Sequence, residues 1–322
     1  SWGVSATYLG SYSDRLWAQS AQNPGVFLGL GPCTLNTATG PRSYPVCSVN
    51  GNLNERRVLS LENPVRSSQI GALDLNTDIG WQKYKGLKLA ARHRSTTGVS
   101  LNASYTLSKC EGTATANTFN QTSAGYSIPD DPDFDAGYCD QDRKHLGTLN
   151  MGYQTPEIGS GVVRALASNW RLSGILSARS GNRINVTSGV DRAFNGIAAQ
   201  RPDQVSDDIY GAGKDASDLE PGQQINDYLN RNAFALPAAG AVGNATRNLA
   251  VGPGYWQVDL AISKLVSSIG TQRLELRIET FNLFNTFNWG DPAANLNAAN
   301  FGRITTQAGA PRILQFGVKY DF

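Results

Sequence analysis

Apolar and polar residues alternate with a period of two in several segments of this chain. In the last segment, Leu314, Phe316, Val318, Tyr320 and Phe322 alternate with Gln315, Gly317, Lys319 and Asp321. Residues 99–109 alternate in the same way. The pattern predicts β-strands that have one apolar and one polar face. A shift of one residue would expose the whole apolar set, so the register of such strands is strongly specified.

The same reading along the chain predicts about eight strands whose connections alternate in length. The strands are expected at residues 2–10, 80–94, 99–109, 143–154, 169–179, 255–266, 272–286 and 312–322; the long connections are 11–79, 110–142, 180–254 and 287–311, and the short ones are 95–98, 155–168 and 267–271. Barrels of the outer membrane have short periplasmic turns and long external loops. We therefore predict an all-β fold, an antiparallel transmembrane β-barrel segment with long external loops and short periplasmic turns.

Composition supports strands and excludes other classes of protein. Only 40% of the residues are apolar and Met occurs once, whereas the chain has 34 Gly, 12 Tyr and 6 Trp, which suits strands and turns. The formal net charge of +2 gives no reason to expect a nucleic-acid partner. No apolar stretch approaches the roughly 18 residues of a transmembrane helix. The N-terminal Ser-Trp-Gly-Val has no signal sequence, so we read the chain as a mature protein or a fragment.

The four cysteines form two pairs by spacing, Cys33 with Cys47 and Cys110 with Cys139. Each pair lies in a stretch rich in Gly, Asn and Thr, which we take to be external loop and not strand. We expect two local disulfides formed in an oxidising compartment. A zinc site is the alternative, but the chain has no C-x-x-C and both histidines lie in segments with strand character.

An acidic stretch is the candidate for a metal site. Asp131, Asp133 and Asp135 have the 1, 3, 5 spacing of a calcium loop, and Asp142 occupies its twelfth position. Gly137 stands at the seventh position and not the sixth, and the last ligand is Asp in place of a bidentate Glu. We therefore favour a solvated acidic loop over structural calcium, and we expect no other cofactor.

Charged residues also occur on the polar faces of the expected strands: Lys88, Arg92, Glu275, Arg277, Glu279 and Lys319. In a large barrel they would line the channel or bind its plug. Pairing across neighbouring strands is an equally good explanation.

The chain lacks the common motifs of catalysis, since it has no G-x-S-x-G, H-E-x-x-H, G-x-x-x-x-G-K-[ST] or G-x-G-x-x-G opening a helix. His145, Asp142 and a serine could form a triad, but a histidine paired with a carboxylate at a strand edge is the simpler reading. We expect a protein that is not an enzyme.

Two motifs resemble those of outer-membrane receptors. The final Gln-Phe-Gly-Val-Lys-Tyr-Asp-Phe, with Phe316, Val318, Tyr320 and Phe322 at alternate positions, resembles the C-terminal signal by which the barrel assembly machinery recognises its substrates. Residues 274–285 resemble the R-x-E-x-F-N-L-F-N strand of TonB-dependent receptors.

Further motifs are similar to the Oar-like branch of these receptors, whose members carry a carboxypeptidase-regulatory-like domain. They are residues 54–57 (NERR), 84–89 with 105–109, 142–145 (DRKH), 170–175 (WRLSGI), and 243–248 (GNATRN) before Gly252-Pro253-Gly254. Their order and spread cover nearly the whole chain.

The resemblance implies a protein of the cell outer membrane that contacts outer-membrane lipid and takes up or binds an unknown ligand through external loops. Such receptors have barrels of about 22 strands. They also have a plug and a segment that contacts TonB, neither of which we find here. We therefore expect residues 1–322 to be the C-terminal portion of a barrel, linked to the TonB system through an N-terminal part.

Two alternatives remain open: a small self-closed outer-membrane barrel acting as an enzyme or adhesin, and a secreted carbohydrate-binding β-sandwich. A closed eight-stranded barrel has room inside only for side chains. The six charged residues would then need near-complete pairing to offset their desolvation. We therefore expect the strands to form a curved, open wall in which residues 2–10 do not pair with 312–322.

Overall fold

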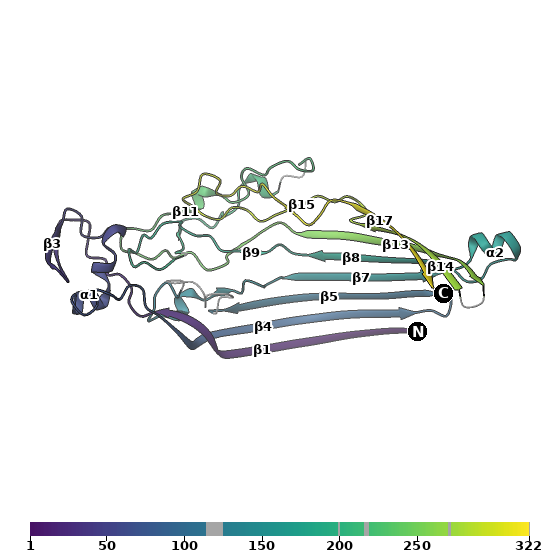
Figure 1. Cartoon of the computed structure of the whole chain (residues 1–322), viewed down its shortest axis with the longest axis horizontal. Coiled ribbons are helices and arrows are strands. Elements are labelled where there is room, and N and C mark those ends of the chain that lie inside the picture. Colours follow the sequence, from purple (N-terminus) through teal and green to yellow (C-terminus); the bar gives the residue numbers. More distant parts are fainter. Residues whose placement is uncertain (114–124, 199, 216–218, 270–271, 322) are drawn as a thin grey trace.

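Long strands lie side by side in the computed structural model, which describes residues 1–113, 125–198, 200–215, 219–269 and 272–321 (Figure 1). The main antiparallel sheet contains β1 (Trp2–Ala21), β4 (Asp74–Arg94), β5 (Val99–Gly112), β7 (His145–Gln154), β8 (Trp170–Arg179), β13 (Tyr255–Ile269), β14 (Gln272–Phe281) and β17 (Ile313–Asp321), in this order. A short ninth strand, β6 (Gly137–Tyr138), pairs with β5. Each long strand therefore pairs with those that precede and follow it along the chain, as in an up-and-down barrel wall.

The connections hold the remaining short elements. They are β2 (Cys33–Thr37), β3 (Gly40–Tyr44), η1 (Asn50–Asn52), η2 (Asn54–Arg56), α1 (Val58–Glu62), η3 (Pro132–Asp135), α2 (Gly161–Ala167), β9 (Arg183–Ile184), β10 (Asp203–Gln204), η4 (Ala212–Lys214), η5 (Arg231–Ala233), β11 (Phe234–Ala235), β12 (Ala250–Val251), β15 (Asn288–Trp289) and β16 (Gln307–Ala308). Among the described residues, no helix has both the length and the apolar character needed to span a membrane.

Each segment expected as a strand contains one, but three ends differ from the prediction by more than three residues. β1 continues to Ala21 and β4 begins at Asp74, so these two strands take up about a quarter of the first expected loop. β14 stops at Phe281 and not at 286. The reason is local: Asn282 has a left-handed φ of 53°, and its side chain accepts a hydrogen bond from Thr286 N at 2.8 Å. This left-handed residue interrupts the regular extended backbone directly after Phe281, so the motif F-N-L-F-N turns the chain.

The register confirms that the sheet has one polar and one apolar face. Directly opposite residues in an antiparallel sheet share a face. Pairings such as Lys88 with Thr106, Ser104 with Thr148 and Glu275 with Lys319 run from strand to strand across the sheet. Through these pairings, Lys88, Arg92, Glu275, Arg277, Glu279 and Lys319 all fall on the polar face.

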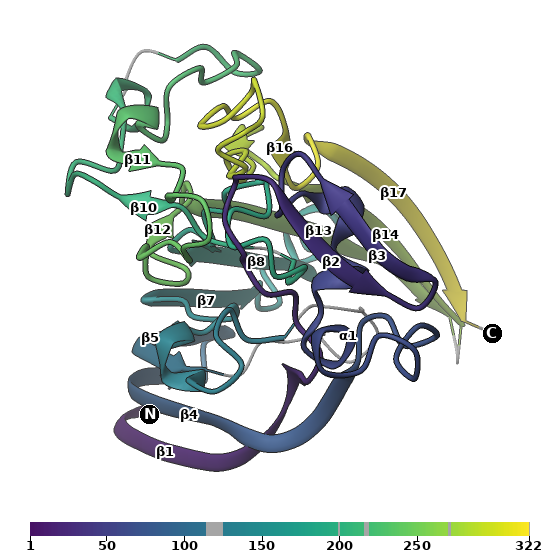
Figure 2. The ribbon, with the colours of Figure 1, turned by 90° about the vertical axis from the view of Figure 1, so that its left-hand side faces the viewer.

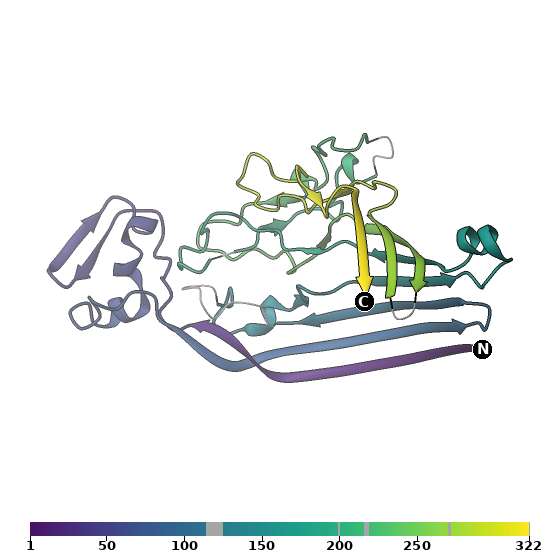
Figure 3. The same cartoon turned by 45° about the vertical axis from the view of Figure 1, so that its right-hand side comes forward.

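The sheet curves without closing (Figure 2). Within the described part of the chain β1 pairs with β4 and β17 pairs with β14, and no pairing joins β1 to β17. Both termini lie at the end of the sheet that carries the short turns (Figures 1 and 3). The open wall expected from the charged residues is therefore the arrangement found.

The third and fourth long connections pack against each other and form a core of their own. Its buried residues are Ile184, Val186, Ile209, Ile225, Tyr228, Leu229, Ala233, Phe234, Ala250, Leu296, Phe301 and Ile304. Backbone hydrogen bonds join the two connections: Ile225 and Ile304 exchange a pair at 3.1 and 2.8 Å, and Tyr228 N donates to Gly302 O at 2.8 Å. We call this packed assembly, made of the described residues within 180–254 and 287–311, the loop unit. The alternation of short and long connections does not reveal such a core.

Candidate functional site

The polar face carries its charges in pairs along the strands. The Arg277 guanidinium lies 2.6 Å from the Glu279 carboxylate, and the Lys319 ammonium lies 3.1 Å from Asp321. Glu275 stands directly opposite Lys319 in the register. Lys88 and Arg92 are exposed on the same face of β4. The face therefore carries charged side chains on β4, β14 and β17 and is suited to contact water or a polar partner.

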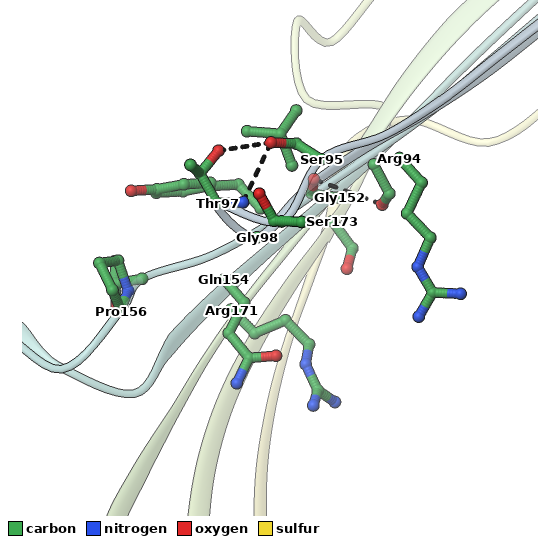
Figure 4. Close-up of a pocket in the computed structure, with 14 residues that line it drawn as sticks. Arg94, Ser95, Thr97, Gly98, Gly152, Gln154, Pro156, Arg171 and Ser173 are labelled. Carbon is green, nitrogen blue, oxygen red and sulfur yellow. Dashed lines mark hydrogen bonds between the residues drawn. The ribbon is translucent and has the colours of Figure 1, made fainter. Parts of the chain in front are cut away.

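Two cavities open on this face at the end of the short turns. The larger, of about 490 Å³, lies beside the turn after β4 and is lined by residues that include Arg94, Gln154 and Arg171 (Figure 4). The turn itself is held by the Ser95 and Thr97 hydroxyls, which lie 2.6 Å apart. Figure 4 shows the guanidinium groups of Arg94 and Arg171 extending away from that turn.

The smaller cavity, of about 270 Å³, shares Arg171 with the first and is also lined by Arg273, Glu275, Lys319 and Asp321, among others. Arg171, Arg273 and Arg94 form no ion pair with any described residue. The guanidinium groups of these three arginines can donate hydrogen bonds to carboxylates or carbonyl groups of a partner that enters the barrel.

At the opposite end, buried arginines tie the long connections together. Arg56 in the first connection is fully buried, and its side chain donates to Asn52 Oδ1 at 2.9 Å and to Phe194 O at 3.1 Å. Burial lowers the pKa of Arg56, and the charges of Asp191 and Glu55 partly offset this effect. One side chain thus fastens the first connection to the loop unit.

The second connection is held to the loop unit in the same way. Asp135 accepts hydrogen bonds from Ser127 N at 2.6 Å and from the Ser127 hydroxyl at 2.9 Å, and it forms a buried ion pair with Arg201. Arg247 donates to Gly112 O at 2.7 Å and to Thr113 O at 3.1 Å. Burial lowers the pKa of Arg247.

The acidic stretch does not form a calcium loop. Asp133 accepts from Trp81 Nε1 at 2.8 Å, Asp135 pairs with Arg201, and Asp142 accepts from Cys110 N at 2.7 Å and from Arg183 Nε at 2.8 Å. In the described ranges no group of three or more His, Cys, Asp or Glu side chains could hold a metal ion. With the exception of Asp131, these carboxylates instead bind other side chains or the backbone.

Both predicted disulfides are present. Cys33 is bonded to Cys47 and Cys110 to Cys139, with Cα–Cα separations of 5.2 and 5.4 Å. The prediction that the cysteines avoid strands was wrong, since Cys33 begins β2 and Cys110 lies near the end of β5. Each bridge therefore fastens a loop to the end of a strand.

The hypothetical triad is not assembled. His145 Nδ1 lies 2.6 Å from the Tyr105 hydroxyl on the apolar face, whereas Asp142 is engaged by Cys110 N and Arg183. The two side chains hydrogen-bond to different groups, so they cannot act together as in a triad.

The C-terminal motif is on the apolar face. Phe316 and Val318 are 74% and 72% exposed in β17, and they stand opposite Ile278 and Leu276 of β14. Tyr320 follows on the same face. Phe322 lies outside the described residues.

Sequence reasoning also missed a polar cavity of about 430 Å³ in the first connection, lined by residues that include Thr39, Arg42, Glu55 and Gln69. Figures 1 and 3 show β2, β3 and α1 beyond the ends of the long strands. In the sequence, only the resemblance of residues 54–57 to the Oar-like receptors pointed to this region.

Comparison with protein families decides the class of protein. A family model described as outer membrane beta barrel domain matches residues 1–315. The chain belongs to the outer membrane beta barrel domain family. None of the curated proteins compared with this barrel domain is a significant match.

The family places this barrel domain in the outer membrane. One face of its sheet exposes apolar side chains, among them Val4, Leu89, Met151 and Phe316, as the outer face of such barrels does. The secreted β-sandwich considered from the sequence is therefore wrong. A sandwich would bury that face against a second sheet.

Proposed function

We propose that this barrel domain is part of the wall of a TonB-dependent receptor of the Oar-like kind, which recognises a ligand by its external loops and does not catalyse a reaction. The observation that carries the proposal is the open, curved sheet with a hydrophilic face. A wider barrel keeps the charges of this face in water, whereas closure of eight strands would bury them in a narrow lumen. Each edge of the wall then pairs with a strand outside residues 1–322, because bare edges are prone to aggregate.

The external end supports a role in recognition. The loop unit has a hydrophobic core, and buried Arg56 and Arg201 fasten the first two connections to it. Recognition loops bind more tightly when they are ordered before the ligand arrives. The polar cavity beside Arg42 and Glu55 offers both charges and hydroxyl groups to a ligand.

The arginines at the end of the short turns favour the presence of a plug domain inside the barrel. Arg94, Arg171 and Arg273 lie where a plug domain would meet the wall, and guanidinium groups suit carboxylates and backbone carbonyl groups. On this proposal these arginines hold the plug, and transport requires that these contacts be released.

The mass and the envelope partners of the native protein test the proposal. The protein isolated from outer membranes should be much heavier than the 34.5 kDa of residues 1–322, and it should crosslink to TonB in intact cells. A native protein of 34.5 kDa with no TonB adduct would overturn the proposal in favour of the small self-closed barrel.

A further inference from the structure

The connection between β7 and β8 carries an apolar surface that the barrel wall does not use. Its helix α2 exposes Val162, Val163 and Leu166 by 74%, 57% and 69%. Residues three and four positions apart share one side of a helix, so these three side chains form a single apolar face. Ile158 extends the patch on the approach to the helix. We call this face the α2 patch.

The helix is held firmly at the rim of the sheet. Thr155 N donates to Trp170 O at 2.9 Å and Trp170 N donates to the Thr155 hydroxyl at 2.9 Å, so the hairpin extends beyond β7. The Ser168 hydroxyl then accepts from Ile158 N at 2.7 Å and closes the segment at its base. Gly159 and Gly161, both with positive φ, turn the chain sharply into the helix.

The contacts of α2 join it to the lipid-facing side of the wall. The Trp170 indole donates to Leu166 O at 2.7 Å, and the ammonium of Lys264 lies 5.2 Å from the centre of the Trp170 ring while it donates to Ser168 O. Trp170 and Lys264 stand opposite each other in the register, on the apolar face. Tryptophan and lysine in this arrangement are typical of the headgroup level of a membrane.

The charge of the segment does not oppose insertion. Arg164, on the other side of the helix, is paired with Glu157. That ion pair raises the pKa of Arg164 and lowers the pKa of Glu157, so both remain charged and neutralise each other.

We propose that the α2 patch lies in the inner leaflet of the outer membrane, at the boundary between headgroups and acyl chains. The occupant of the patch is phospholipid, because the Trp170 indole joins the patch to the apolar face of a wall that belongs to an outer-membrane barrel. Short amphipathic helices enter this boundary with their apolar side. In this position α2 fixes the depth and tilt of the wall at its periplasmic rim.

Fluorescent labels on the two sides of the helix test the proposal. All four cysteines are in disulfides, so Val163→Cys or Leu166→Cys supplies a single thiol for a bimane label. The protein purified from outer membranes is labelled and returned to vesicles of phosphatidylethanolamine and phosphatidylglycerol that contain lipid spin-labelled near the headgroup. Arg164→Cys is the matched control on the opposite side, and Phe316→Cys is the lipid-exposed reference.

Labels at 163 and 166 should emit at short wavelength and be quenched by the spin-labelled lipid about twofold or more above the label at 164. Equal quenching at all three positions, with emission typical of water, would overturn the proposal. Short-wavelength emission without quenching would also overturn it, because the patch would then be covered by protein, either a second copy or a periplasmic partner.

Discussion

At the level of single residues, buried charges join the long connections of this barrel domain. Asp135 and Arg201 are both nearly inaccessible to water. They belong to two different connections and are 66 positions apart in the sequence. Charges buried in this way are costly unless each keeps its partner. The pair therefore makes the order of one loop depend on the order of the other.

Replacement of Arg201 by Ala should loosen the external end. The substitution leaves the carboxylate of Asp135 buried without its cation, which costs about 3 to 5 kcal/mol in comparable cases. Limited proteolysis and hydrogen exchange of outer-membrane preparations should show early opening of residues 125–142 and 180–254. Arg164→Ala, which removes a fully exposed ion pair, is the matched control and should change neither measurement; equal effects would show that burial is not the cause.

A second residue-level prediction concerns alkaline pH. Burial raises the pKa of Tyr228 above its ordinary value, and its hydroxyl donates to Val251 O at 2.9 Å. The folded loop unit therefore keeps this phenol neutral at a pH where the unfolded chain ionises it. The stability that results is fully present below the ordinary tyrosine pKa of about 10 and is lost as the pH rises above that value.

We expect protease resistance of the loop unit to fall between pH about 10 and about 12. Tyr228→Phe should reduce this dependence on pH, although it removes one hydrogen bond and lowers stability at neutral pH. An unchanged pH profile in the variant would assign the effect to another group, such as Tyr126, whose pKa burial also raises.

At the level of elements, β17 shows how the register divides the residues between lipid and lumen. Replacement of Phe316 or Val318 by Arg should cost about 2 to 4 kcal/mol if the residue lies near the bilayer midplane. Gln315→Arg should be tolerated, because Gln315 stands opposite Glu279 on the polar face. Urea titration in lipid vesicles measures the difference, and similar losses for all three variants would contradict the register.

The element boundaries show where local patterns are sufficient and where they fail. Alternation predicted the course of β5 and β17 because the polarity of each position follows from the face on which it lies. It failed at the end of β14, where the apolar residues Leu283 and Phe284 follow Phe281 although Asn282 turns the backbone. It also missed α2, because a helix of two turns is too short to show its period.

At the level of the whole molecule, the unpaired edges of the sheet are the feature with the widest consequence. If the wall belongs to a larger barrel, β1 and β17 should remain apart in the native protein. Ser5→Cys combined in turn with cysteine at Gln315, Gly317 or Lys319 should give no crosslink within one chain, because a disulfide requires Cα atoms closer than about 7 Å. Ser104→Cys with Thr148→Cys is the control, since their hydroxyls lie 2.8 Å apart, and it should oxidise readily. Efficient closure between β1 and β17 would contradict the open wall.

The sequence by itself determined the two faces of the strands, the alternation of long and short connections, and the partner of each cysteine. These properties depend on near neighbours, because side chains alternate along a strand and each disulfide closes a short loop. Outer-membrane localisation followed from the same evidence, and the family comparison bears it out.

Only the tertiary structure decided how the loops meet. Ile225 and Ile304 are buried together, but neither belongs to a periodic segment. The acidic stretch suggested a metal site from its spacing alone, whereas the partner of Asp135 is an arginine far along the chain. Contacts between irregular segments depend on their positions in space, and a local pattern carries no information on those positions.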